Sequence, residues 1–286
     1  SGQNTYTGST AVNGGTLKAG AANAFSGSSA HSVGAGGTLD LAGFSQKLPS
    51  LANGGVVSLA GGVPGTTLTI TGAYVGHNGT LRLGIAPGGS DRLVLDGASA
   101  SASGRTTMQV ANLGGLGALT IGSGIELVSA LNGARTTAQS TKDAFALAGG
   151  HVDAGAYEYR LYAADANGAG ENWYLRSAVQ SAGSQLPAYR SEVPMLAALP
   201  EQLRQGNLGM LGSLRVRMGD DDARLGRNDA GDAADGPRRS AWGRVISTSL
   251  NIRQGGTVSP KSEGRVTGLQ AGTDLWADRN WRAGVY

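Results

Sequence analysis

Cysteine is absent from the 286-residue chain, so disulfides, thiol nucleophiles and cysteine-bound metals are excluded. This absence is typical of a protein that crosses an oxidising compartment, such as a bacterial periplasm, without forming stray cross-links. The sequence also lacks an apolar run long enough for a membrane-spanning helix. The net charge is only +3 and no basic run is interleaved with aromatics, so we expect no nucleic-acid partner.

Candidate catalytic residues are equally scarce. His31, His77 and His151 are isolated, and no G-x-S-x-G motif is present. A Ser-His-Asp triad is not excluded by sequence, but exposed or packing histidines are the favoured interpretation. The glycines of residues 114–122 match neither a dinucleotide fingerprint nor a P-loop, and indicate turns. We therefore expect no enzyme, no catalytic residue and no cofactor.

Two acidic stretches, Asp220–Asp222 and Asp229–Asp235, raise the question of a Ca²⁺ site. They lack the ligand order of an EF-hand, because Gly231 stands where a ligand belongs, and they lack the nonapeptide calcium repeat. A solvated linker is the stronger interpretation, and no metal site is assigned.

Glycine, in contrast, is abundant at 49 residues, and it marks a repeat. The related phrases NGGTLKAG, GAGGTLDLAG, NGGVVSLAGG and HNGTLRLG place glycines at 15, 37, 55 and 79, at steps of 22, 18 and 24 residues. Repeats near 20 residues are typical of solenoids, in which each turn covers its neighbour. Each phrase opens with Asn-Gly or Gly-Gly, which indicates turns with positive φ.

Short alternating apolar runs follow these turn signals and predict strands with one buried face. The runs are Leu39/Leu41, Val57/Leu59, Leu81/Leu83, Leu68/Ile70, Leu93/Leu95, Leu119/Ile121 and Ile125/Leu127. The predicted fold class is mostly β: a right-handed parallel β-helix with a C-terminal cap, one linker α-helix, and then the start of an antiparallel outer-membrane β-barrel.

The predicted organisation has four parts. Residues 1–77 are β-helix rungs, and residues 78–177 are the cap. A solenoid needs such a cap because its last rung has no neighbour. An aromatic hairpin across Asn167-Gly168 would serve, and its predicted cap residues are Tyr157, Tyr159, Leu161, Trp173, Tyr174 and Leu175. A sugar-binding platform is the alternative for these aromatics. Asn78-Gly79-Thr80 also matches a glycosylation sequon, although a turn already requires Asn-Gly there.

Residues 178–236 are predicted to be a linker that contains a helix over about 200–225, with Pro200 in its first turn. The helix carries a narrow apolar stripe, Leu199, Leu203, Met210, Leu214 and Met218. Its length of roughly 39 Å is close to a bilayer's thickness, yet it is too polar for lipid. A polar pore would accommodate it.

Residues 237–286 predict the first strands of a barrel. Leu269, Ala271, Thr273 and Leu275 alternate with Gly268, Gln270, Gly272 and Asp274, and Trp276 and Trp281 flank the next turn. Strands with an apolar outer face, a polar inner face and terminal aromatics are typical of outer-membrane barrels.

In order and spacing, these motifs resemble the passenger–barrel junction of pertactin-like autotransporters (type V secretion). Residues 4–20, NTYTGSTAVNGGTLKAG, resemble the passenger-associated repeat. The motifs from Gly79 to Leu175 resemble the autochaperone region. Residues 217–220, 242–244 and 269–274 resemble the linker helix and first barrel strands. Family members that cleave themselves carry Asn-Asn where this chain has Gly212 and Ser213, so no cleavage residue is assigned.

The resemblance implies a location in the bacterial outer membrane and at the cell surface. It implies outer-membrane lipid and the barrel-assembly machinery as partners, and an autochaperone that templates folding of the passenger outside the cell. Adding one rung to a formed end costs less entropy than nucleating several. The alternative is an adhesin whose rungs bind a host surface or matrix protein. A polysaccharide-cleaving β-helix would need clustered carboxylates, and residues 1–77 hold only Asp40.

Overall fold

The computed structural model describes residues 2–136, 142–181, 184–225, 241–277 and 282–285. The chain divides into two compact units, an N-terminal unit (Ser1–Arg190) and a C-terminal unit (Ser191–Tyr286). No helix in the described part of the chain combines the length and the apolar character needed to cross a membrane.

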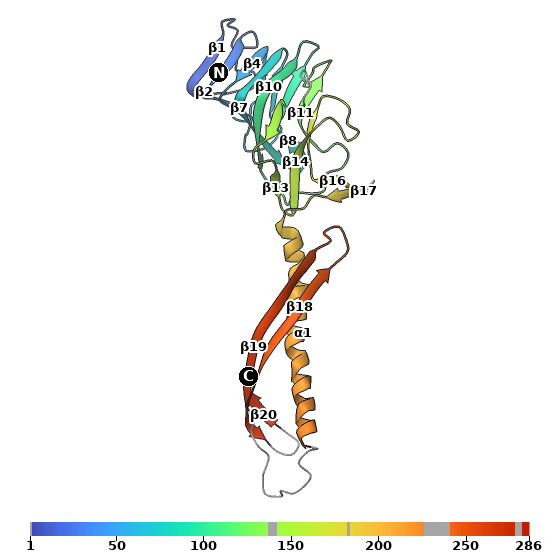
Figure 1. The fold of residues 1–286 in the computed structure, drawn as a ribbon. Coiled ribbons are helices and arrows are strands. Elements are labelled where there is room, and N and C mark those ends of the chain that lie inside the picture. Colours follow the sequence, from blue (N-terminus) through green and yellow to red (C-terminus); the bar gives the residue numbers. More distant parts are fainter. Residues whose placement is uncertain (1, 137–141, 182–183, 226–240, 278–281, 286) are drawn as a thin grey trace. The chain divides into compact units, whose positions relative to one another are not determined.

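The N-terminal unit is a parallel β-solenoid of about four turns, coloured from blue to green in Figure 1. The turns contribute strands to two sheets, and among the described residues only the first turn, with β1, has no strand in the second sheet. The first sheet contains β1 (Thr10–Lys18), β2 (Ala30–Asp40), β4 (Ser50–Asn53), β5 (Val56–Ser58), β7 (Ala73–Ala86), β10 (Ser101–Asn112) and β12 (Phe145–Leu147), with β8 (Gly89–Ser90) on the edge of β7. The second contains β3 (Gln46–Leu48), β6 (Thr67–Ile70), β9 (Arg92–Asp96) and β11 (Ile125–Leu131).

Strand register confirms the repeat that the sequence predicts. Leu17 pairs with Leu39, Leu39 with Val57, Val57 with Leu81 and Leu81 with Met108, all in parallel. The last four side chains of this column are fully buried. The core therefore runs along the solenoid axis as a column of aliphatic side chains, each covered by the turn before and the turn after it.

The structure corrects the reason for the repeated glycines. Only Gly15, at φ 69°, and Asn78, at 60°, have the positive φ expected of these turn signals. The Asn-Gly and Gly-Gly pairs lie inside β1, β2 and β7, or between β4 and β5. They mark bends along a strand rather than turns between strands. A Cβ on Gly37 would overlap the carbonyl of Val12, and one on Gly55 would overlap the carbonyl of Gly34. Close approach between successive turns, rather than φ, requires glycine at these two positions.

A second expectation, a strand at Leu119 and Ile121, was wrong. Residues 113–124 form a loop, and the Ile121 side chain is 85% exposed. Neither sheet receives a strand from this segment. Hydrogen bonds from the cap, described below, hold it instead.

Asp91 links two turns from a fully buried position. Its carboxylate accepts hydrogen bonds from the backbone N–H groups of Gly65 and Thr66, both at 2.9 Å, and of Gly84 at 2.7 Å. These donors belong to the turn before β6 and to the end of β7. No local pattern in the sequence marks this role, because the nearest donor is seven residues away.

We expect Asp91→Asn to lower the free energy of unfolding by about 2–3 kcal/mol, since it places an amide donor against a buried N–H donor. Urea unfolding followed by circular dichroism measures the change. Asp96→Asn is the control, because Asp96 accepts an exposed hydrogen bond from Asn132. Equal stabilities of the two variants would contradict the role given to Asp91.

Residues from 178 onward, predicted to be a linker, first form β16 (Ala178–Ser181) and β17 (Ser184–Pro187), which pair antiparallel. The chain then returns to the N-terminal unit. The N–H of Glu158 donates to the carbonyl of Ala188, and the N–H of Arg190 donates to that of Ala156. The N-terminal unit therefore continues to Arg190.

The C-terminal unit consists of α1 (Glu192–Leu225) and the antiparallel strands β18 (Ala241–Arg253), β19 (Lys261–Ala277) and β20 (Arg282–Val285). The helix begins eight residues before the predicted start at 200 and contains Pro200 in its interior. Its first turn holds Glu192 and Pro194 instead. Proline is tolerated there because the first-turn N–H groups lack helical acceptors.

Candidate functional site: the cap of the solenoid

An antiparallel hairpin closes the parallel stack. β14 (Tyr157–Ala163) pairs with β15 (Trp173–Arg176), and β13 (Val152–Ala154) pairs with the outer edge of β14. The hairpin expected around Asn167-Gly168 is thus present. Its strand β15 pairs antiparallel with β11, and β11 pairs parallel with β9 on its other edge. β11 is therefore the junction at which the parallel ladder ends.

The predicted cap residues divide between two degrees of burial. Tyr159, Trp173 and Leu175 are buried, at 3%, 3% and 0% exposure. Tyr157 and Leu161 are partly buried and pack against the core, and Tyr174 is also partly buried. All six lie on β14 and β15, so the hairpin brings them onto one sheet at the end of the solenoid.

Trp173 is the centre of this packing. Its ring meets Phe145 edge-on, with centroids 5.3 Å apart, and Phe145 lies 6.0 Å from Tyr74 of the solenoid core. The indole N–H donates to the Thr136 hydroxyl at 3.0 Å. Edge-to-face pairs add stability beyond their buried area. The cap is thus joined to the turns below it by an aromatic series.

Several residues that hold the cap were missed from the sequence. Asn172 accepts from the N–H of Ala130 at 2.8 Å and donates to Glu126 at 2.7 Å, which joins β15 to β11. Arg176 lies over the rings of Tyr162 and Tyr174, at 5.0 and 5.8 Å. Only Arg176 had a local signal, since a cation in an aromatic hairpin favours stacking. The β11 partners of Asn172 lie more than 40 residues away.

Tyr159 fixes the loop of residues 113–124. Its hydroxyl donates to the carbonyl of Ala118 and accepts from the N–H of Ala118, both at 2.7 Å. The buried Ser177 hydroxyl donates to the same carbonyl at 2.8 Å and accepts from the N–H of Thr120 at 2.8 Å. Through these contacts the cap positions a loop that contributes no strand.

A polar series inside the solenoid accompanies the aliphatic column. The amide of Asn53 donates to the Tyr74 hydroxyl at 3.3 Å, and that hydroxyl lies 3.0 Å from the Thr106 hydroxyl. Burial raises the pKa of Tyr74, which keeps the phenol protonated. The three residues belong to successive turns, so the series fixes their register.

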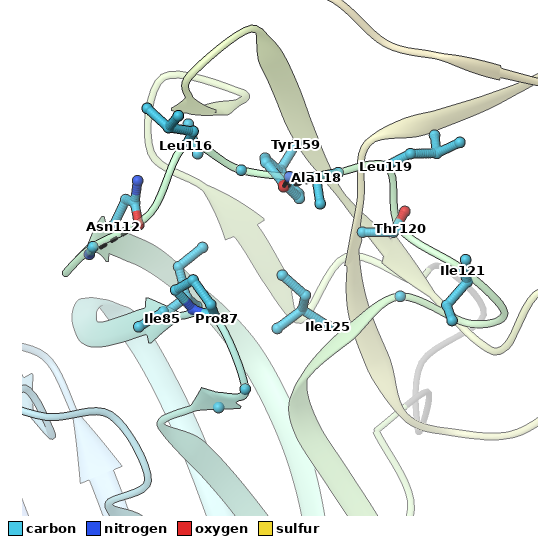
Figure 2. Close-up of a pocket in the computed structure, with 17 residues that line it drawn as sticks. Ile85, Pro87, Asn112, Leu116, Ala118, Leu119, Thr120, Ile121, Ile125 and Tyr159 are labelled. Carbon is cyan, nitrogen blue, oxygen red and sulfur yellow. Dashed lines mark hydrogen bonds between the residues drawn. The ribbon is translucent and has the colours of Figure 1, made fainter.

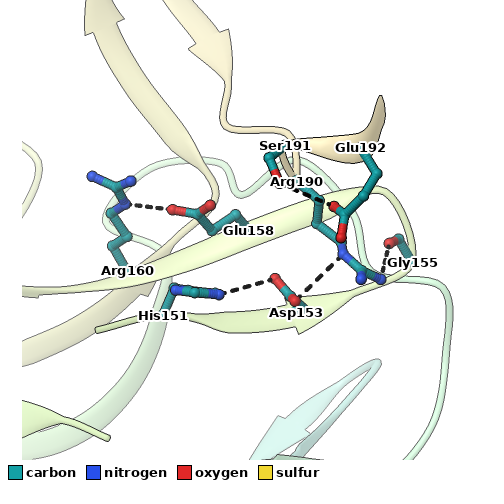
Figure 3. A network of polar contacts seen from close by, with 8 residues as sticks. All are labelled: His151, Asp153, Gly155, Glu158, Arg160, Arg190, Ser191 and Glu192. Carbon is teal, nitrogen blue, oxygen red and sulfur yellow. Dashed lines mark hydrogen bonds and ion pairs between the residues drawn. The ribbon is translucent and has the colours of Figure 1, made fainter. Parts of the chain in front are cut away.

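The histidines do not converge. His31 is buried in β2, and desolvation lowers its pKa, so the ring is neutral at pH 7. His77 is exposed. His151 lies 3.8 Å from Asp153, which is also 3.4 Å from Arg190 (Figure 3). No group of three metal-ligating side chains occurs within the described ranges. Residues 229–235 fall outside those ranges, and the side chains of residues 220–222 are not described.

In the C-terminal unit, α1 packs against the strand face that carries Arg244 and Gln270. Gln202 donates to the Ser262 hydroxyl at 2.6 Å, and Arg244 donates to the carbonyl of Met210 at 3.4 Å. Leu250 and Ile252 are buried on the same face. The opposite face is open and mixed: Val245 is 78% exposed and Leu269 80%, and polar side chains such as Ser249 and Glu263 lie on it too. Gln270 and Asp274 are buried, while Leu275 is exposed, which follows the alternation expected for β19.

The described part of the predicted helix stripe is about half-exposed. Leu199, Leu203 and Met210 are 45%, 60% and 48% exposed, whereas Ala198 is buried. Leu214 and Met218 lie in the part of α1 whose side chains are not described, as do Gly212 and Ser213. Trp276 is half-exposed, and Trp281 lies outside the described residues.

The class defined by this arrangement is a parallel β-solenoid closed by an antiparallel cap. The autochaperone domain family of type 1 matches residues 60–161, which span the last solenoid turns and reach into β14. Among relatives, the adhesin BmaC autotransporter of Brucella suis is 35% identical over 186 residues, covering 58% of this chain and 5% of the relative. The probable autotransporter YfaL of Escherichia coli is 42% identical over 128 residues, covering 43% and 9%.

A third relative, the uncharacterized protein YdeU of Escherichia coli, is 38% identical over 121 residues, covering 41% of this chain and 23% of the relative. The chain thus spans less than a quarter of the length of each of these relatives. The match over residues 60–161 and the autotransporter names of two relatives support the interpretation of this region as the passenger and autochaperone part of a pertactin-like autotransporter.

Proposed function

We propose that this chain templates the folding of its own passenger at the bacterial surface and anchors it in the outer membrane, with no catalytic role. The N-terminal unit supplies the template. The C-terminal unit supplies the first strands and the pore helix of a translocating barrel. Outer-membrane lipid and the barrel-assembly machinery are the partners that this role requires.

The two unlike edges of β11 carry the proposal. Its antiparallel edge is occupied by β15, so the stack is closed toward the C-terminus. Its parallel edge receives β9, and the same parallel pairing continues through β6 to β3. A cap that forms first therefore offers one growing edge, and turns add to it toward the N-terminus.

Energetics favour growth in this direction. Each added turn places one or more aliphatic side chains of the Leu39–Leu81 column against an existing turn. Burial of such a side chain is worth about 1.5–3 kcal/mol. A first turn formed alone would lose its backbone entropy, about 1–2 kcal/mol per residue, before any such burial. The hairpin of the cap also loses backbone entropy, but its loop-closure cost is small because its strands are close in sequence.

The C-terminal unit supports the anchoring role. Toward one end of the strands Val245, Leu269 and Leu275 are exposed on one face, while α1 contacts the other face, which carries Arg244, Gln270 and Asp274. An apolar outer face with a polar lumen is the arrangement of an outer-membrane barrel. The described strands would then be the beginning of that barrel, with α1 inside it.

A matched pair of leucines tests templating. Leu175 in the cap and Leu39 in the second turn are both fully buried. In refolding of the purified chain from urea, Leu175→Ala is expected to slow folding, because the cap is formed in the transition state. Leu39→Ala is expected mainly to speed unfolding. If Leu39→Ala slows folding and Leu175→Ala mainly speeds unfolding, templating from the cap is refuted.

The cellular test uses the full-length protein to which the chain belongs. Deletion of residues 79–177 is expected to leave passenger that stalls or is protease-sensitive on intact cells. Val63→Ser, at a 77% exposed position, is the control. If the deletion leaves the amount and the protease resistance of the surface passenger unchanged, residues 79–177 serve only as part of the stalk.

An adhesin role is the second candidate, because one of the relatives is named an adhesin. Under this alternative, the exposed faces of β1 to β7 bind a host surface or matrix protein. Binding of the purified chain to cells or matrix proteins, unaffected by Leu175→Ser under conditions where the turns remain folded, would favour adhesion.

A further inference from the structure

A cavity of about 490 Å³ lies beside the cap, between the end of β7 and the loop of residues 112–124 (Figure 2). Apolar side chains dominate its walls: Ile85, Pro87, Leu116, Leu119, Ile121 and Ile125. Volumes of roughly 300–1,000 Å³ are typical of small-molecule sites. The templating and anchoring roles do not use this space.

The polar side chains in the wall are already satisfied by the protein. The Tyr159 hydroxyl both donates to and accepts from the backbone of Ala118. Asn112 accepts from the N–H of Gly114 at 3.2 Å and donates to the carbonyl of Gly115 at 3.1 Å. No charged side chain is among the described residues that line the cavity. A charged or strongly polar ligand would lose its hydration there without compensation.

The same contacts disfavour an extended peptide as the occupant. Strand addition needs free backbone groups along an edge. In this wall, the N–H and carbonyl of Ala118 are bonded to Tyr159, and the N–H of Thr120 is bonded to Ser177. The wall offers apolar contact but no ladder of hydrogen bonds, and it has no basic group to attract a lipid headgroup.

Close backbone contacts fix the position of the loop that forms one wall of the cavity. Gly117 has φ 66°, and a Cβ there would overlap the carbonyl of Ala154, which keeps the loop close to β13. Gly115 lies against the ring of Pro87, where a Cβ would approach to 2.5 Å. Leu116 and Ile121 extend from the loop at 83% and 85% exposure. An apolar occupant would give these two side chains a surface to cover.

We propose that this cavity binds one small, uncharged, apolar organic molecule. The occupant is a free small molecule, rather than a membrane or a polypeptide. Its recognition rests on shape and desolvation, and its binding joins β7, the loop and the cap through a common contact.

Two fluorescent probes with one ring system test the charge requirement in the purified chain. N-phenyl-1-naphthylamine is uncharged, and 8-anilino-1-naphthalenesulfonate carries a sulfonate. We expect saturable binding of one uncharged probe per chain, and at least ten-fold weaker binding of the sulfonate. Equal affinities, or a signal that does not saturate, would overturn the proposal.

Ala118→Trp places an indole at the cavity wall and is expected to weaken binding of the uncharged probe at least ten-fold. Ala169→Trp adds the same group to an exposed loop outside the cavity and should leave affinity unchanged. If Ala118→Trp fails to fold, Ile121→Ser at its exposed position is expected to weaken binding several-fold. Binding that survives both changes would belong elsewhere, for example on the exposed face of β19, and would refute the site.

Photolabelling with an uncharged alkyl diazirine locates the occupant directly. We expect label in the peptides that contain residues 85–89 and 112–125, and loss of that label with excess N-phenyl-1-naphthylamine. Neutral phospholipid vesicles and an apolar peptide serve as competitors. If the vesicles or the peptide remove the label under conditions where free N-phenyl-1-naphthylamine does not, the cavity belongs to a membrane or a polypeptide and the proposal is overturned.

Discussion

Trp173→Ala is expected to lower the free energy of unfolding of the N-terminal unit by about 3–5 kcal/mol. The side chain is 3% exposed, so its removal leaves a large cavity. It also removes the edge contact with Phe145 and leaves the buried Thr136 hydroxyl without the indole donor. A loss of this size approaches the whole stability of many domains, which is about 5–15 kcal/mol.

Urea unfolding followed by circular dichroism and by proteolysis of the solenoid measures this effect. Trp173→Phe keeps a ring against Phe145 and is expected to cost only about 1–2 kcal/mol, the contribution of the lost hydrogen bond and some packing. Trp276→Ala is the matched control, because Trp276 is half-exposed in the other unit. An unchanged unfolding midpoint in Trp173→Ala would show that the hairpin does not cap the core.

Gly55→Ala is expected to destabilise the stack by about 3 kcal/mol, although it adds a single methyl group. The added Cβ would overlap the carbonyl oxygen of Gly34 and lie 2.9 Å from the Val33 side chain. Neither neighbour moves freely. The carbonyl of Val33 accepts from Gly54 at 2.8 Å, and the carbonyl of Gly55 accepts from Thr80 at 2.7 Å, so the turns are held at fixed spacing.

Hydrogen exchange read by mass spectrometry separates this local effect from global unfolding. Because solenoid turns contact only their neighbours, Gly55→Ala should lose protection in β2 and β5 before the cap does. Gly62→Ala is the control, since its Cβ would meet open space. Its stability is expected to stay within about 0.5 kcal/mol of the unsubstituted chain. Equal stability of the two variants would show that Gly55 is kept for another reason.

Much of the architecture could be predicted from local patterns. The glycine-spaced phrases predicted the turns that pair Leu17 with Leu39 and Val57 with Leu81, because a repeated pattern of strand and bend can bury its apolar face only on a copy of itself. Asn167-Gly168 predicted the hairpin that joins β14 to β15. Alternation along β19 predicted which side chains lie on each face.

Local patterns failed where long-range contacts compete with them. Leu119 and Ile121 alternate as a strand does, yet the hydroxyls of Tyr159 and Ser177 hold their loop away from both sheets. Pro200 has the preference of a first-turn residue, but the helix starts at Glu192, where Pro194 occupies that turn. In the first case the deciding side chains, Tyr159 and Ser177, are distant in the sequence. In the second, Pro194 occupies the first turn. The local propensities of Leu119, Ile121 and Pro200 take neither into account.

By itself, the sequence determined the period of the solenoid, the positions of the bends and the composition of the cap, because these depend on residues within one turn of each other. Only the tertiary structure decided the roles of Asp91, Asn172 and Phe145, and opened the cavity beside Tyr159. Their contacts join segments from seven to more than 40 residues apart. The stacking of turns creates such contacts, because it places residues from different turns beside each other.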